Sequence, residues 1–135
     1  MATARDEEAI TQAFTNYIQA FQTLDPHATS PYFHVPCMFL PPRGVHVLTT
    51  AADVQALLVQ IMEGLKARDY ARSELLNRHV NQVSDNTALV TVSRVRYASD
   101  GRELERFGET YTLRRIESGW KIAVAMIHDP DIVLR

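Results

Sequence analysis

Residues 73–128 read SELLNRHVNQVSDNTALVTVSRVRYASDGRELERFGETYTLRRIESGWKIAVAMIH. Three polar dipeptides, Asp85-Asn86, Asp100-Gly101 and Ser118-Gly119, divide this stretch into four segments rich in β-branched and aromatic residues. Such dipeptides favour two-residue hairpin turns. The stretch therefore predicts four consecutive antiparallel strands, at about 73–83, 87–98, 103–116 and 120–128. Because a two-residue turn fixes the register of its strands, the side chains that share a face can be worked out.

The composition limits the class of protein. A chain of 135 residues has the length of a single domain, 1–135, and can bury a core without disulfides. The net charge of −2, with no basic run, argues against a nucleic-acid partner. No segment is long and apolar enough to span a membrane, and the start lacks the apolar stretch of a signal peptide. We therefore expect a cytoplasmic protein without a membrane partner.

The region before the four strands predicts helices. Apolar residues recur at helical spacing from Ile10 to Leu24, after a start at which Thr3 is a candidate N-cap. Asp25-Pro26 is typical of the start of a further helix, which we expect to be short and to end near Tyr32.

A short hairpin and a third helix follow. Residues 37–40 and 45–48 predict two short strands joined by a turn at 41–44. Thr50 and Asp53 predict the start of a helix. Its apolar stripe comprises Val54, Leu57, Leu58, Ile61, Met62 and Leu65. Helices on one face of a mostly antiparallel sheet give an α+β fold.

The turn positions divide the side chains of the sheet between two faces. Opposed residues of a hairpin point the same way. The first face gathers the large groups Val90, Val92, Phe107, Tyr111, Leu113, Ile122, Val124 and Met126, so we expect the helices to pack there. The second face is smaller and rich in threonine, yet it still carries Leu89, Val95, Tyr97, Leu104 and Ile127. Such a face often meets a partner, and we predict a homodimer through it.

Polar residues on the first face are the candidate site. They are Asn77, His79, Asn81, Arg94, Glu109 and His128. The register predicts that Glu109 and His128 lie opposite each other, an arrangement suited to general acid–base catalysis near neutral pH. A structural ion pair is the alternative interpretation. A metal on His79, Glu109 and His128 has suitable ligand types, but no spacing enforces it, so we assign no metal.

The candidate ligand-binding residues surround this pair. They are Tyr17, Phe21, Phe39, Asn77, His79, Arg94, Phe107, Tyr111 and Met126. Arg94 is suited to holding an oxygen anion, and the tyrosines can donate hydrogen bonds. The alternative is that Arg94 and Arg96 pair with glutamates of the neighbouring strand. We therefore expect a small, mostly apolar ligand with a carbonyl or carboxylate, and chemistry that needs no cofactor.

The order of elements resembles that of the nuclear transport factor 2-like superfamily, which includes ketosteroid isomerase and the SnoaL-like polyketide cyclases. The ending from Tyr111 to Ala123, with Gly119-Trp120-Lys121-Ile122, is similar to that superfamily's common last hairpin. The resemblance implies a cone-shaped, strongly curved sheet packed on three N-terminal helices, the cystatin-like fold. It also implies an internal pocket and frequent homodimers. Tyr17 looks comparable to the pocket tyrosine of the isomerases, whereas no aspartate on the first face matches their carboxylates.

Two functions remain open. The first is an isomerase, cyclase or hydrolase that uses Glu109 and His128 for proton transfer on a small molecule. The second is a non-catalytic ligand-binding or dimerisation module. The sequence does not identify the ligand or the reaction.

Overall fold

The computed structural model describes residues 4–132, and the side chains of residues 6–132. Its elements in chain order are α1 (Ala4–Gln22), α2 (Pro26–Thr29), the 3-10 helix η1 (Ser30–Tyr32), β1 (Phe33–Leu40), β2 (His46–Leu48), α3 (Ala51–Ala67), β3 (Tyr70–Ser84), β4 (Thr87–Ala98), β5 (Glu103–Ile116) and β6 (Gly119–His128). The order predicted from the sequence is confirmed. The proposed Thr3 cap lies outside the described residues.

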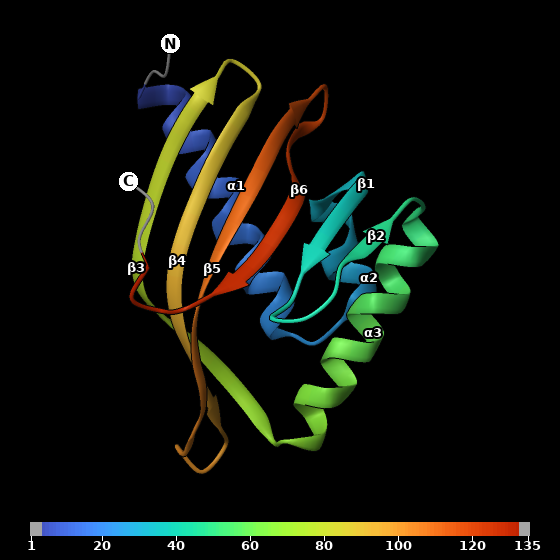
Figure 1. Ribbon diagram of the computed structural model, residues 1–135, viewed down its shortest axis with the longest axis vertical. Coiled ribbons are helices and arrows are strands. Elements are labelled where there is room, and N and C mark those ends of the chain that lie inside the picture. The colour runs from blue at the N-terminus through green and yellow to red at the C-terminus, as the bar shows by residue number, and fades with distance from the viewer. Residues whose placement is uncertain (1–3, 133–135) are drawn as a thin grey trace.

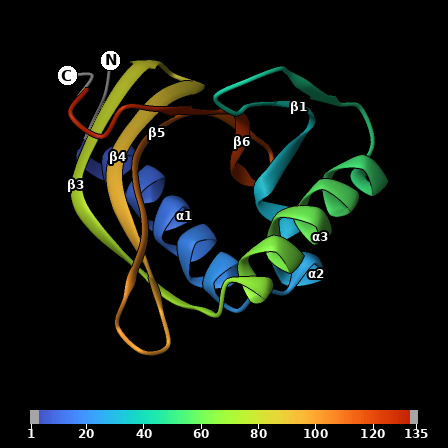
Figure 2. The same ribbon diagram turned by 60° about the horizontal axis from the view of Figure 1, so that its bottom comes forward.

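The six strands form one sheet in the order β2-β1-β6-β5-β4-β3. Only the β1–β6 pair is parallel; the other neighbours are antiparallel. The sheet is strongly curved but not closed, and the helices lie on its concave side (Figures 1 and 2). The α+β prediction with a curved sheet packed on three helices is therefore confirmed. We call the concave, helix-covered side of the sheet the inner face and the convex side the outer face.

Local capping explains where α2 and α3 begin. The Asp25 carboxylate accepts a hydrogen bond from the His27 N–H at 2.9 Å, and Pro26 occupies the first helical turn. At α3, the Thr50 hydroxyl accepts from the Asp53 N–H at 3.1 Å. Both caps agree with the sequence prediction. With its start fixed at Thr50, α3 faces the sheet with its apolar stripe.

The register between β4 and β5 matches the prediction through the candidate site. Arg94 lies opposite Phe107, and Val92 lies opposite Glu109. The inner face of these two strands therefore carries the predicted residues. Beyond Arg96 the register shifts by one residue as the strands approach the Asp100-Gly101 turn.

The register between β5 and β6 differs from the prediction. Ile116 pairs with Gly119, so the turn lies at residues 117–118, one residue earlier than expected. An irregularity between Thr112 and Leu113 then shifts the pairing by one residue in the opposite direction. As a result Glu109 pairs with Ile127, while His128 pairs with Gly108. Because a one-residue shift moves side chains to the other face, the predicted opposition of Glu109 and His128 is wrong.

A second shift changes the faces of β3. The Asp85-Asn86 turn is confirmed, because Ser84 pairs with Thr87. An irregularity between Gln82 and Ser84 then offsets the following pairs. Three residues predicted on the inner face therefore share the outer face with their partners on β4: Asn81 with Leu89, His79 with Thr91 and Asn77 with Ser93. Extra residues in a strand give little signal in a sequence, which explains the error.

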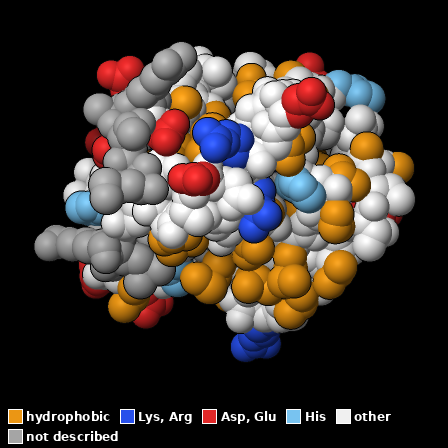
Figure 3. Space-filling view, turned by 90° about the horizontal axis from the view of Figure 1, so that it is seen from above, with side chains coloured by type: hydrophobic (Ala, Val, Ile, Leu, Met, Phe, Trp, Pro, Cys, Tyr) orange, Lys and Arg blue, Asp and Glu red, His pale blue; other side chains and the backbone are white. Residues whose placement is uncertain are grey.

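The outer face is partly apolar. The registers align half-buried side chains in a row across it: Leu89, Thr112, Val124 and Met38. Hydrophobic side chains gather in the lower part of the space-filling view, on the side that the outer face of the sheet forms (Figure 3).

Among residues 4–132, no helix has the length and apolar character needed to cross a membrane. The cytoplasmic location stays a prediction.

Candidate functional site

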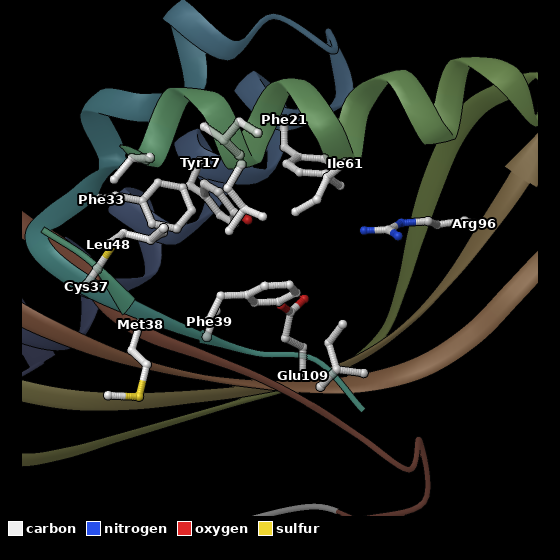
Figure 4. A pocket seen from close by; sticks show the side chains of 15 residues that line it. Tyr17, Phe21, Phe33, Cys37, Met38, Phe39, Leu48, Ile61, Arg96 and Glu109 are labelled. Carbon is white, nitrogen blue, oxygen red and sulfur yellow. The ribbon is translucent and has the colours of Figure 1, made fainter. Parts of the chain in front are cut away.

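A cavity of about 180 Å³ lies between the helices and the inner face of the sheet. Its walls come from α1, α3, β1 and β2 on one side and from β4, β5 and β6 on the other. The lining residues are Tyr17, Phe21, Phe33, Cys37, Met38, Phe39, Leu48, Val54, Leu57, Leu58, Ile61, Arg96, Glu109, Ala125 and Ile127. The side chain of Met38 points away from the cavity, toward the outer face (Figure 4). Most of this surface is aromatic or aliphatic. The volume is of the order of an apolar cavity of about 150 Å³ that binds benzene.

Three polar side chains project into this apolar space. Tyr17 extends from α1, and Glu109 extends from β5 on the opposite wall (Figure 4). Arg96 enters from a third side, on β4 (Figure 4). Few polar groups converging in an apolar cavity are typical of a small-molecule site, because they orient a ligand whose body the apolar wall holds.

Glu109 belongs to a buried ion-pair network behind the cavity wall. Arg94 donates from Nη2 to Glu109 Oε1 at 2.8 Å, and the Tyr111 hydroxyl donates to the same oxygen at 2.6 Å. Arg94 Nη2 also donates to the Tyr111 hydroxyl. Arg94 is 1 % exposed and Glu109 6 %, so both charges of the pair are shielded from water. The two hydrogen bonds to Oε1 thus hold the Glu109 side chain in place. The other carboxylate oxygen, Oε2, accepts no hydrogen bond from a described residue.

Burial raises the pKa of two tyrosines and one thiol in and beside the cavity. Desolvation, reinforced by the Glu109 charge, raises the pKa of Tyr17 to about 12. Desolvation raises the pKa of the Cys37 thiol to about 11 and that of Tyr111 well above its usual range. All three groups are therefore neutral near pH 7. Tyr17 can therefore donate a hydrogen bond to a ligand oxygen. The three neutral groups add no charge to the cavity wall.

The predicted site residues separate into three groups. Tyr17, Phe21, Phe39 and Glu109 line the cavity. Arg94, Phe107 and Tyr111 are buried on the inner face beside it. The remaining four, Asn77, His79, Met126 and His128, lie on the outer face, because the strand irregularities reverse their orientation.

His128 takes part in a different polar cluster. Its Nε2 lies 2.7 Å from the Thr110 hydroxyl, which lies 3.1 Å from that of Thr91. Its Nδ1 lies 2.9 Å from the backbone oxygen of Asp129. The sheet separates this cluster from the cavity, so His128 and Glu109 do not form a catalytic pair. For the same reason His79, Glu109 and His128 do not gather around a metal.

The sequence reasoning missed several lining residues. Arg96 pairs with Glu105 across the strands, and it also lines the cavity, for which it was not proposed. Ile127 was assigned to the outer face through the same register error that moved His128, and Ala125, on the same side of β6, was not proposed as a lining residue. The irregular pairing of β1 with β6 brings Cys37 to the cavity wall, and no sequence motif indicates this.

Residues 6–130 match the model of a protein family described as NTF2-like protein (DUF6841). This match covers almost the whole chain. The chain belongs to this NTF2-like family. None of the curated proteins matches it. The resemblance to the nuclear transport factor 2-like superfamily is thereby confirmed.

Solved structures share the NTF2-like fold. An NTF2-like protein with a cystatin-like fold from Novosphingobium aromaticivorans is 20% identical, with a TM-score of 0.76, over 96% of this chain and 84% of that one. A ketosteroid isomerase-like protein from Erwinia carotovora atroseptica is 18% identical, with a TM-score of 0.71, over 93% of this chain and 97% of that one. At such identities the likeness extends to the fold and not to the activity.

Proposed function

We propose that this NTF2-like protein binds a small, mostly apolar molecule that carries a carbonyl or carboxylate, and transfers a proton on it without a cofactor. One observation carries the proposal: an apolar cavity into which Tyr17 and Glu109 project from opposite walls. Tyr17 supplies a neutral donor for the ligand oxygen. Glu109 supplies a carboxylate oxygen, Oε2, that the Arg94–Tyr111 network leaves unbonded.

The chemistry follows from these two groups. Glu109 takes a proton from the carbon next to a carbonyl, and the bonding electrons of that carbon form an enolate. The Tyr17 hydroxyl donates a hydrogen bond to the enolate oxygen, which stabilises the charge in a dry site. Where a C=C bond of the ligand is conjugated with the enolate, Glu109 returns the proton to the far carbon of that bond, so the product is an isomer and no other reactant is consumed.

A non-catalytic ligand-binding protein is the alternative, and the same network favours it. Arg94 and Tyr111 both donate to Glu109, and such bonds stabilise the carboxylate. A carboxylate that two donors hold in a fixed position suits the orientation of a ligand. The two functions share the cavity and differ in whether Glu109 exchanges a proton with the ligand.

A ligand screen followed by isotope exchange tests these functions in turn. Thermal-shift assays with small ketones, such as cyclohexanone and acetophenone, and with small carboxylic acids should identify binders, because a ligand at 100 times its dissociation constant adds about 2.7 kcal/mol. A bound ketone is then incubated with the protein in D₂O and followed by proton NMR. Catalysis predicts loss of the signal next to the carbonyl with wild-type protein and not with Glu109→Gln. Binding without exchange supports the non-catalytic alternative, and a screen without binders contradicts both.

We also propose that the protein forms a homodimer through its outer face. The half-buried apolar row of Leu89, Val124 and Met38 supports this, because the helices cover only the inner face (Figure 1). Val124→Glu should convert the dimer to a monomer in light-scattering measurements. Val59→Glu, on the exposed side of α3, is the matched control and should leave the mass unchanged. A wild-type protein of monomer mass would contradict the proposal.

A further inference from the structure

Arg96 lies where the cavity meets an outer groove. Its guanidinium points into the cavity (Figure 4), and its side chain is 11% exposed. It also lines a shallower groove between α3 and the end of β5, together with Arg68 and Glu105. Phe39, Leu57 and Ile61 line both spaces as well. The groove is therefore an approach to the cavity, and a ligand entering by it passes Arg96.

The hydrogen bonds of Arg96 are incomplete. Its Nη1 donates to Glu105 Oε1 at 3.2 Å. Its Nε is buried and has no hydrogen-bond partner in the described part of the chain. The rings of Phe107 and Phe21 lie 4.7 Å and 5.5 Å from the guanidinium carbon. An unpaired donor on a buried charged group is costly, so this guanidinium is short of an acceptor.

The charges around Arg96 are also unequal. Arg94 is paired with Glu109 at 2.8 Å. Arg96 and Arg68 share one carboxylate, that of Glu105, at 3.2 Å and 2.9 Å. Three arginines therefore face two glutamates, which leaves one positive charge in excess beside a cavity with few other polar groups. Such a charge raises the local concentration of anions and is best balanced by a single one.

We propose that the ligand of the cavity is a small organic monocarboxylate with an apolar body, bound with its carboxylate on Arg96. The inference rests on the proposed function, because it names the ligand class of the same cavity. A guanidinium recognises a planar carboxylate by parallel hydrogen bonds, and the unpaired Nε–H is one of the donors that suit this geometry. The aromatic and aliphatic walls accept the body of the ligand, toward Tyr17 and Glu109.

The test compares acids with their neutral amides. Acetate, 2-methylpropanoate, benzoate and phenylacetate are titrated by calorimetry at pH 7 against the protein, and so are the four primary amides. Each amide matches its acid in shape but is uncharged, and it has a donor NH₂ in place of one acceptor oxygen. We expect the best acid to bind at least tenfold more tightly than its amide. Arg96→Met should weaken that acid by about 10- to 100-fold, the usual range for a hydrogen bond to a charged group, and change the amide little.

Two further variants complete the design. Arg114→Met removes an exposed positive charge outside the cavity and groove, and it should change neither affinity. Glu105→Gln removes the internal anion that competes for Arg96, and it should raise the ratio of acid to amide affinity several-fold. That increase is not expected from a merely structural Arg96, and it keeps the test decisive if Arg96→Met does not fold.

The outcomes separate this inference from the proposed function. Equal affinity for acid and amide, or a ratio unchanged by both Arg96→Met and Glu105→Gln, overturns the carboxylate assignment. Ketone binding in the cavity would then still support the proposed function. If no acid, amide or ketone binds, the proposed function itself fails and the ligand class fails with it.

Discussion

The two faces of the sheet each carry a buried polar cluster, and consecutive residues of β5 contribute to both. Glu109 and Tyr111 point inward to Arg94, and Thr110 between them points outward to His128. The inner cluster contains a buried ion pair beside a cavity. The outer cluster joins hydroxyls to one imidazole. In the described part of the chain, a buried ion pair lies on the inner face, beside the cavity, whereas hydrogen bonds alone join the buried polar groups of the outer face.

The largest expected effect comes from breaking the inner cluster. Arg94→Met leaves the Glu109 carboxylate buried without its cation and should lower the free energy of unfolding by about 3–5 kcal/mol. The double variant Arg94→Met/Glu109→Met should recover much of this loss, because no unpaired charge remains. Urea denaturation measures both.

An exposed arginine provides the control for Arg94. Arg106 forms an ion pair with Glu103 at 3.0 Å, but its side chain is 47% exposed. Arg106→Met should change the unfolding free energy by less than about 1 kcal/mol. If Arg94→Met costs no more than Arg106→Met, the inner cluster does not hold a desolvated ion pair, and the contrast between the two faces is lost.

The reactivity of Cys37 tests how far water is excluded from the cavity wall on the inner face. A thiol pKa raised from 9.0 to about 11 leaves roughly a hundredfold less thiolate at pH 8 than an unburied thiol has. Because the chain has one cysteine, labelling with methyl methanethiosulfonate reports this site alone. The labelling rate should still rise about tenfold per pH unit between pH 9.5 and 10.5, where the rate of glutathione levels off. A plateau below pH 9.5 would mean that water reaches the thiol freely.

Gly108 tests the close packing on the outer face. An added Cβ would lie 2.6 Å from the His128 ring and 2.7 Å from the Asp129 backbone oxygen. Gly108→Ala should therefore lower the free energy of unfolding by about 1–3 kcal/mol. Gly64, within α3, has nothing within 4 Å of such an atom, and Gly64→Ala should stabilise the protein by about 0.5–1 kcal/mol. Thermal and urea unfolding of the two variants should shift in opposite directions; a harmless Gly108→Ala would disprove the close approach of His128.

The sequence predicts the elements well because their signals are local. The caps at Asp25 and Thr50 and the Asp85-Asn86 turn depend on residues within one turn of the chain, and all are present. The pairing of Arg94 with Phe107 was also predicted correctly, although the register shifts between this pair and the Asp100-Gly101 turn.

Within the four predicted strands, the sequence placed the site residues correctly on β4 and β5 but not on β3 and β6. The β5–β6 turn lies one residue earlier than predicted and an irregularity lies near Thr112, so together they place Ile127 instead of His128 opposite Glu109. The cavity itself arises where β1 pairs with β6, two strands more than eighty residues apart, so its shape depends on tertiary packing rather than on a motif. Tyr17, Phe21 and Phe39 could be proposed as lining residues, whereas Cys37 could not.

The smallest expected effect concerns ligand binding and follows from the placement of the two faces. Tyr17→Phe removes a hydroxyl from the cavity and keeps the ring, so it should weaken the binding of acetophenone by about 2- to 10-fold, the range for one neutral hydrogen bond. His128→Gln changes the outer cluster alone and should alter the dissociation constant by less than a factor of about two. Calorimetric titration of both variants decides the point, with unfolding curves to confirm that each is folded. If His128→Gln weakened acetophenone binding more than Tyr17→Phe did, the outer cluster would be coupled to the ligand. The assignment of ligand binding to the inner face alone would then be wrong.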